Sequence, residues 1–149
     1  MESFSYYDLG RIEYGEALDL QTNSFQSLID AKRKGLEEKN CLYFCEHNPV
    51  LTLGKSGKET NLLVPELLLK EKGVSLFHID RGGDITYHGP GQITGYPVFD
   101  LDGFGMGLKA YIHTLEDIVI EFLLLYGVKA ERLDGATGVW LDSKVPGAA

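Results

Sequence analysis

One short segment, residues 81–92, gathers side chains that could contact a substrate. It holds four glycines, an arginine, a histidine, a tyrosine and a proline within twelve residues. Its first part, Arg81-Gly82-Gly83, places a guanidinium beside backbone N–H groups that no side chain covers. Such a combination suits a carboxyl, a thioester carbonyl or a phosphate. His88, beside a turn, is equally compatible with hydrogen bonding in a pocket and with a structural role.

The residue pattern of this segment predicts a hairpin. Residues 85–88 alternate apolar and polar side chains, which indicates a short strand. Gly89-Pro90-Gly91 indicates a turn, because glycine allows positive φ and proline fixes its own φ. Residues 92–100 would then form the returning strand, in which Pro97 favours an edge or a bulge.

The remaining elements follow from apolar spacing and turn residues. Two amphipathic helices are predicted, from Tyr14 to about Lys39 and over Leu108–Tyr126, and the second should be largely buried. The other predicted elements are strands at 41–45, 50–53, 74–79, 129–133 and 137–141 and a short helix at 66–72. Strands occur both in hairpins and after helices, so we expect an α+β fold, a mixed β-sheet with packed helices. A chain of 149 residues without a linker predicts one domain, residues 1–149.

Composition narrows the classes of partner. A net charge of −8 argues against nucleic acid. No apolar run approaches the length of a membrane span and no signal-peptide pattern opens the chain, so we expect no membrane association and a cytoplasmic location. Cys41 and Cys45 would lie about 13 Å apart in an extended strand, too far for a disulfide, and we interpret them as buried structural thiols.

Two glycine-rich segments do not fit nucleotide-binding fingerprints. Gly54-Lys55-Ser56 ends like a phosphate-binding loop, but Pro49 stands where that pattern needs its first glycine. The glycines at 103, 105 and 107 likewise miss the dinucleotide fingerprint. Both segments are better explained as turns.

The whole segment Arg81–Gln92 closely resembles the signature of the octanoyltransferases, the lipoyl(octanoyl) transferases of protein lipoylation. Three other segments are similar to blocks of the same family: Glu46–Gly54, Gly54–Leu63 and Thr137–Trp140. The resemblance implies the fold of biotin-protein ligases and lipoate ligases, a class II synthetase-like core. It also implies a substrate-binding set made of Arg81, Gly82, Gly83, Asp84, Ile85, Thr86, Tyr87 and His88.

The resemblance further implies a reaction and its partners. An octanoyl (or lipoyl) group would pass from octanoyl-acyl carrier protein to a lysine of the lipoyl domains of 2-oxoacid dehydrogenase complexes and of the glycine cleavage H protein. The group would move through a cysteine thioester, with a lysine that favours the thiolate and with no cofactor. Because these carriers are generally acidic, contact would need local basic residues, and Lys55, Lys58 and Arg81 are the candidates.

The family's lysine and cysteine both follow the Thr137–Trp140 block, and no residue up to Ala149 matches either one. Lys144 lies too early, and Cys41 and Cys45 precede the glycine motif. We therefore assign no catalytic residue. We expect this chain to be the N-terminal part of the family's catalytic domain, with the C-terminal part missing and no turnover on its own.

Two other functions stay open. An ATP-dependent lipoate or biotin ligase would load free octanoate only with ATP. A non-catalytic module would bind an acyl carrier protein or a lipoyl domain without forming a thioester.

Overall fold

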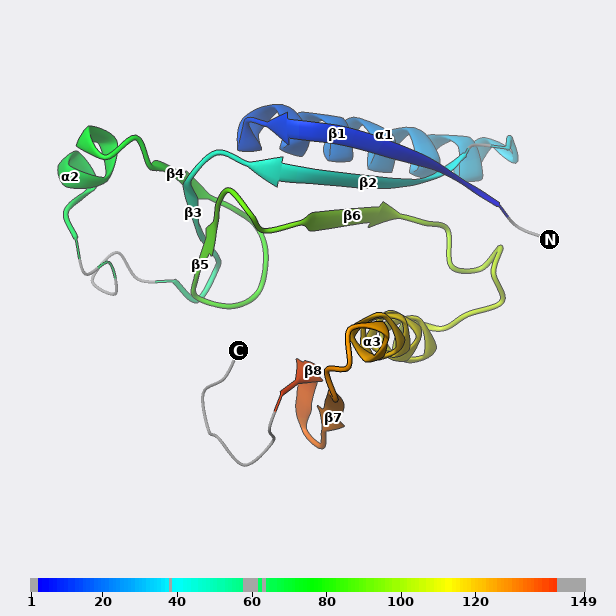
Figure 1. Ribbon diagram of the computed structural model, residues 1–149. Coiled ribbons are helices and arrows are strands. Elements are labelled where there is room, and N and C mark those ends of the chain that lie inside the picture. The colour runs from blue at the N-terminus through cyan, green and yellow to red at the C-terminus, as the bar shows by residue number, and fades with distance from the viewer. Residues whose placement is uncertain (1–2, 38, 58–61, 63, 142–149) are drawn as a thin grey trace. The chain divides into compact units, whose positions relative to one another are not determined.

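The computed structural model describes residues 3–37, 39–57, 62 and 64–141 (Figure 1). The chain divides into two compact units. The larger unit comprises Ser3–Phe99, and the described residues of the smaller unit begin at Asp100. No helix in the described ranges is long and apolar enough to span a membrane.

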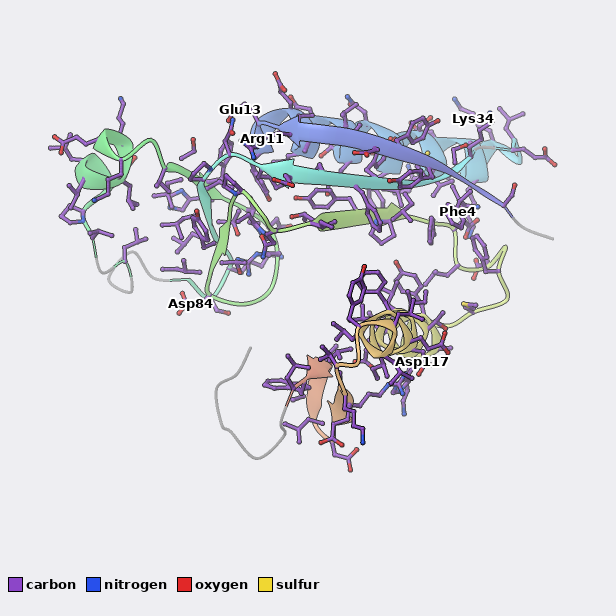
Figure 2. The ribbon with its side chains drawn as sticks, viewed as in Figure 1. Phe4, Arg11, Glu13, Lys34, Asp84 and Asp117 are labelled. Atoms are coloured by element: carbon purple, nitrogen blue, oxygen red, sulfur yellow. The ribbon has the colours of Figure 1, made fainter. Side chains whose placement is uncertain are left out.

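The larger unit contains a three-stranded sheet with a helix on one face. The strands β1 (Phe4–Ile12) and β2 (Asn40–His47) run parallel, and β6 (Thr94–Val98) pairs antiparallel with β2. Helix α1 (Tyr14–Lys34) joins β1 to β2 and returns along the strands, so that Lys34 lies at the same end as Phe4 (Figure 2). A parallel pair needs such a crossover because a tight turn cannot join its ends.

Helix α1 is shorter than predicted. It ends at Lys34 instead of near Lys39, because Gly35 adopts the left-handed conformation (φ 66°) and its N–H bonds back to the carbonyl of Lys32 at 3.2 Å. Glycine adopts this conformation without the steric cost of a Cβ.

A second sheet of the larger unit carries the segment singled out by the sequence. Its central strand is β3 (Val50–Leu53), parallel to β4 (Ser75–His78) and antiparallel to β5 (Ile85–His88). The short helix α2 (Glu66–Glu71) precedes β4. The largest fully buried side chains of the larger unit lie close to the bend that links the two sheets. They are His47, at the end of β2, and Val50 and Thr52 in β3.

The predicted hairpin of residues 85–88 with 92–100 is wrong. Strand β5 pairs with β3, and β6 pairs with β2, so the two strands belong to different sheets. The reason is a matched bend. The chain turns at Asn48-Pro49 between β2 and β3, and residues 89–93 turn at the same place between β5 and β6. Residues 85–98 therefore run antiparallel to residues 41–53 on both sides of the bend, with His88 opposite Val50 and Thr94 opposite Cys45.

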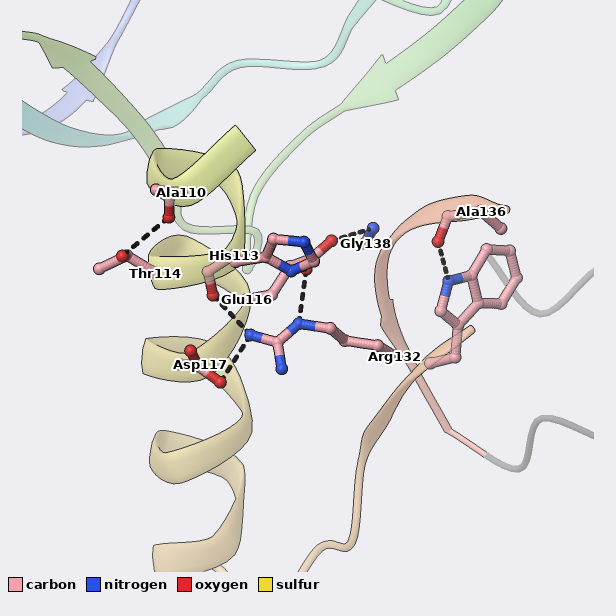
Figure 3. Close-up of polar contacts among 9 residues, drawn as sticks. Ala110, His113, Thr114, Glu116, Asp117, Arg132, Ala136 and Gly138 are labelled. Atoms are coloured by element: carbon pink, nitrogen blue, oxygen red, sulfur yellow. Dashed lines mark hydrogen bonds and ion pairs between the residues drawn. The ribbon is translucent and has the colours of Figure 1, made fainter. Parts of the chain in front are cut away.

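The described part of the smaller unit is one helix and one hairpin. Helix α3 (Leu108–Leu125) is followed by β7 (Glu131–Leu133) and β8 (Ala136–Trp140), which pair antiparallel. Figure 3 shows how they are joined: the Glu116 carboxylate accepts from Arg132 Nε at 2.7 Å and from the Gly138 N–H at 2.8 Å. Arg132 also pairs with Asp117 at 2.6 Å, and His113 Nδ1 lies 3.2 Å from Glu116.

The prediction that α3 is largely buried is wrong for the residues described. Between residues 108 and 125, Glu116 is the single buried residue, and Leu125 is 83% exposed. The apolar face is broad, but the hairpin that contacts the helix is only eight strand residues long and meets it through polar groups.

Candidate functional site

Residues 81–84 form a loop that lies on the turn following β3. Its carbonyls point toward that turn: the N–H groups of Gly54, Lys55 and Ser56 donate to the carbonyls of Asp84, Arg81 and Gly83 at 2.8, 2.9 and 3.2 Å. A Cβ on Gly54 would come within 2.5 Å of the Gly83 carbonyl oxygen, so this close approach requires glycine. We call residues 81–84 the arginine loop, and Figure 2 marks its last residue, Asp84.

The Arg81 side chain turns back against β3 and β5. Its Nη2 lies 3.0 Å from the Thr52 carbonyl, 2.9 Å from Thr52 Oγ1 and 2.6 Å from Thr86 Oγ1. Its Nη1 donates to the Gly82 carbonyl at 2.9 Å. The sequence suggested a guanidinium presented to a ligand, whereas in the structure it makes five hydrogen bonds within the protein, the fifth to the Asp84 carbonyl at 3.4 Å.

His88 ends β5 and joins an aromatic cluster. Its Nδ1 donates to Gln92 Oε1 at 2.7 Å, and its ring lies parallel to that of Tyr14 with centroids 6.4 Å apart. The His47 ring lies 6.0 Å from it, and Tyr14 also contacts Phe77 at 5.0 Å. The cluster thus joins α1, β2, β4 and β5 beside the His88 ring.

His47, the member of this cluster that β2 supplies, is fully buried. Its Nδ1–H donates to the Ile12 carbonyl at 3.1 Å, since a carbonyl can only accept. Its Nε2 is then an acceptor for the Tyr96 hydroxyl at 2.7 Å. Burial raises the pKa of Tyr96, which keeps that hydroxyl protonated as a donor. These partners place the proton of the neutral imidazole on Nδ1.

The eight residues of the substrate-binding set divide between two places. Four form the arginine loop and four form β5, where Thr86 faces Arg81 and His88 faces Tyr14. Tyr87 points elsewhere: it is 53% exposed, and its ring closes off the space beside Gly89. This alternation within β5 is the one that the sequence pattern predicts.

Lys55, one of the predicted basic candidates, is exposed but paired, and of the two cysteines interpreted as buried thiols Cys45 is buried and Cys41 is half-buried. Lys55 is paired with Asp80 at 2.7 Å, and Lys58 lies outside the described residues. Both cysteines are free thiols, and Cys45 is buried. Burial raises the pKa of the Cys45 thiol, which disfavours the reactive thiolate.

A separate hollow of about 550 Å³ lies over β1 and β2. It contains no residue of the substrate-binding set, and its lining is Tyr6, Asp8, Gly10, Arg11, Phe44, Cys45, Glu46 and Ile93. Glu46 links its rim to the turn after His88, because its carboxylate accepts from the Gly91 N–H at 3.1 Å.

Sequence reasoning missed three residues of this site: Tyr14, Thr52 and Tyr96. Tyr14 falls in the first predicted helix, Thr52 in the predicted strand 50–53 and Tyr96 in the predicted strand 92–100, and none of them was a candidate for the site. Their contacts join positions far apart in the chain, from 29 residues for Thr52 with Arg81 to 74 residues for Tyr14 with His88, and no local pattern signals such a pairing.

The fold is similar to that of solved lipoate-protein ligases. A bi-partite lipoate protein ligase from Thermoplasma acidophilum superposes with a TM-score of 0.62 over 97% of this chain and 53% of that one, at 17% identity. A lipoate-protein ligase A bound with ATP gives a TM-score of 0.54 over 90% of this chain and 51% of that one, at 18% identity. At such identities the likeness shows the fold alone, which is the lipoate-ligase-like α+β fold that the resemblance implied.

Sequence comparison is more specific. Residues 13–149 match the family described as lipoyl protein ligase A/B catalytic domain. The octanoyltransferase of Parabacteroides distasonis is 66% identical over 149 residues, which are 100% of this chain and 67% of that protein. Octanoyltransferases of Porphyromonas gingivalis and Bacteroides fragilis are 54% and 55% identical, and the chain spans 29% and 59% of their lengths. The chain belongs to the lipoyl protein ligase A/B catalytic domain family and, within it, to the octanoyltransferases.

Proposed function

We propose that this chain supplies the substrate-binding part of an octanoyltransferase. The enzyme moves an octanoyl group from acyl carrier protein to a cysteine thiolate, releasing the carrier thiol, and then to a lysine amine, releasing the cysteine. The observation that carries the proposal is the 66% identity with an octanoyltransferase over all 149 residues of the chain. The partners are octanoyl-acyl carrier protein and the lipoyl domains of 2-oxoacid dehydrogenase complexes and of the H protein, and the location is the cytoplasm.

The geometry supports a defined role for His88. With Nδ1 bonded to Gln92, the neutral ring keeps a lone pair on Nε2, and the protonated ring offers a second N–H there. The stacked Tyr14 ring fixes the plane of the imidazole. A group held in this way can bond to the acyl thioester or to the incoming amine without first losing rotational freedom.

The test uses a chimaera in which this chain replaces the matching 149 residues of the P. distasonis octanoyltransferase. We expect the chimaera to transfer octanoate from octanoyl-acyl carrier protein to an apo lipoyl domain without ATP, as followed by mass spectrometry of the lipoyl domain. No thioester should form on Cys41 or Cys45. Modification that requires free octanoate and ATP would show a ligase instead.

His88→Ala in the chimaera should lower kcat/KM for octanoyl transfer by about 10- to 100-fold, the usual range for one hydrogen bond to a charged or developing charge. His78→Ala is the matched control, since His78 is an exposed histidine on β4 of the same sheet. Equal rates for the two variants would remove His88 from the site.

A further inference from the structure

Two threonines face each other across the central pair of strands beneath the arginine loop. Thr52 of β3 and Thr86 of β5 are direct partners in the antiparallel register. Thr52 is fully buried, and its hydroxyl donates to the Thr86 carbonyl at 3.4 Å. Valine would fill the same volume and favour a strand as well, so packing does not explain why both positions carry a hydroxyl.

The Arg81 guanidinium explains both hydroxyls. A single nitrogen, Nη2, lies 2.9 Å from Thr52 Oγ1 and 2.6 Å from Thr86 Oγ1. Hydrogen bonds to a charged donor are among the stronger ones in proteins. The two threonines therefore hold the end of a side chain whose backbone begins the arginine loop.

The loop is thereby fixed from two sides. The guanidinium ties its first residue to β3 and β5, and the carbonyls of Arg81, Gly83 and Asp84 accept from the turn at Gly54–Ser56. Gly83 adopts a φ of 90°, a conformation that glycine tolerates and that needs other contacts to make it the single state of the loop. These contacts hold the loop in one conformation without a ligand, so ligand binding does not carry the entropic cost of ordering it.

We propose that Thr52 and Thr86 are positioning residues that act through Arg81 to preset the arginine loop for the acyl carrier substrate. The inference rests on the proposed function for the identity of that substrate. It assigns the guanidinium a role inside the protein, with the loop backbone as the part that the ligand meets.

The test compares Thr52→Val, Thr86→Val and Thr52→Ser in the whole chain. Thr94→Val is the matched control, because the Thr94 hydroxyl is buried in the same unit and has no partner among the described residues. Amide exchange of Gly54, Lys55 and Ser56 is measured by NMR, the Kd for octanoyl-acyl carrier protein by fluorescence anisotropy, and Tm by calorimetry.

We expect either valine variant at the loop to speed exchange of these three amides and to raise the Kd, each by about tenfold. Thr52→Ser should restore both, and Thr94→Val should change neither. Unchanged exchange in the valine variants overturns the proposal, and so does faster exchange with an unchanged Kd, which would leave only a structural role. If Thr52→Val does not fold, the half-buried Thr86→Val decides in its place.

A wild-type chain that does not bind octanoyl-acyl carrier protein would overturn the proposed function instead. Amide exchange is measured without a ligand, so it would still test whether the two threonines order the arginine loop.

Discussion

At the scale of single residues, the most constrained group is His47. It is completely buried, and both ring nitrogens have partners, Ile12 on one side and Tyr96 on the other. A buried polar group that loses its partner costs more than the hydrogen bond itself contributes. The stability of the larger unit should therefore respond to either partner of this imidazole.

Tyr96→Phe should lower the free energy of unfolding by about 1–3 kcal/mol, because it leaves the buried Nε2 of His47 with only the Cys45 thiol, a weak donor 3.5 Å away. Urea denaturation followed by far-UV circular dichroism measures the effect. Tyr6→Phe is the control: Tyr6 is 55% exposed on β1, and its change should stay within about 0.5 kcal/mol. Equal losses in the two variants would contradict the assignment of the tyrosine as the donor.

At the scale of elements, the turn after β3 and the arginine loop depend on one glycine. A Cβ at Gly54 would lie 2.5 Å from the Gly83 oxygen and 3.0 Å from the Arg81 oxygen, both of them backbone atoms that cannot rotate away. The loop would have to lift from the turn.

Gly54→Ala should accordingly lower the free energy of unfolding by about 1–3 kcal/mol, the range for overpacking at a tight site. Gly82→Ala provides the comparison within the same loop, because a Cβ there meets nothing within 4 Å. Denaturation curves of the two variants measure the difference, and a Gly54→Ala protein as stable as Gly82→Ala would show that the loop is not held against the turn.

The sequence predicted elements better than their partners. Local alternation located residues 85–88 as a strand, and the apolar spacing located α3 to within one residue of Leu125. The hairpin prediction was wrong because the residues at 89–93 indicate only that the chain changes direction. The bend at Asn48-Pro49, some forty residues earlier, determines which strand each of the two strands pairs with.

The residues of the candidate site also differ in how far the sequence could predict them. The arginine loop and β5 are contiguous, so a motif could reveal them. Thr52, Tyr14 and Tyr96 reach the site only through sheet pairing and helix packing, which depend on contacts distant in sequence.

At the scale of the whole molecule, the two units are stabilised by different interactions. The larger unit has a buried interior of apolar, aromatic and imidazole side chains. The described part of the smaller unit centres on the Glu116 carboxylate, which is bonded to Gly138 and Arg132, with Asp117 and His113 beside them. Acid should therefore act on the two units unequally.

The pKa of Glu116 lies below its ordinary value of 4.5, first because of the Gly138 N–H and then because of Arg132. A carboxyl with a lowered pKa stabilises the fold above its unfolded pKa and loses that contribution as the pH falls through the folded one. In the larger unit the Gly91 N–H and Arg11 also lower the pKa of Glu46, but that side chain is 38% exposed and lies outside the buried interior. We therefore expect the smaller unit to lose stability below about pH 4.5 before the larger unit does. The only tryptophan of the chain, Trp140, lies in β8, so its fluorescence reports this loss. Circular dichroism, to which α1 and α3 both contribute, should show a later second step as the larger unit unfolds.

Glu116→Gln should lower the Tm of the tryptophan transition at pH 7 and flatten its dependence on pH between about 3 and 5, because a neutral amide has no proton to gain. Glu121→Gln, an exposed position on the same helix, should keep the wild-type profile. A coincident acid transition by fluorescence and circular dichroism, or equal profiles for the two glutamine variants, would mean that the carboxylate does not hold the hairpin to α3. The expected separation follows because, among the described residues, the single buried carboxylate lies in the smaller unit and the buried apolar side chains lie in the larger one.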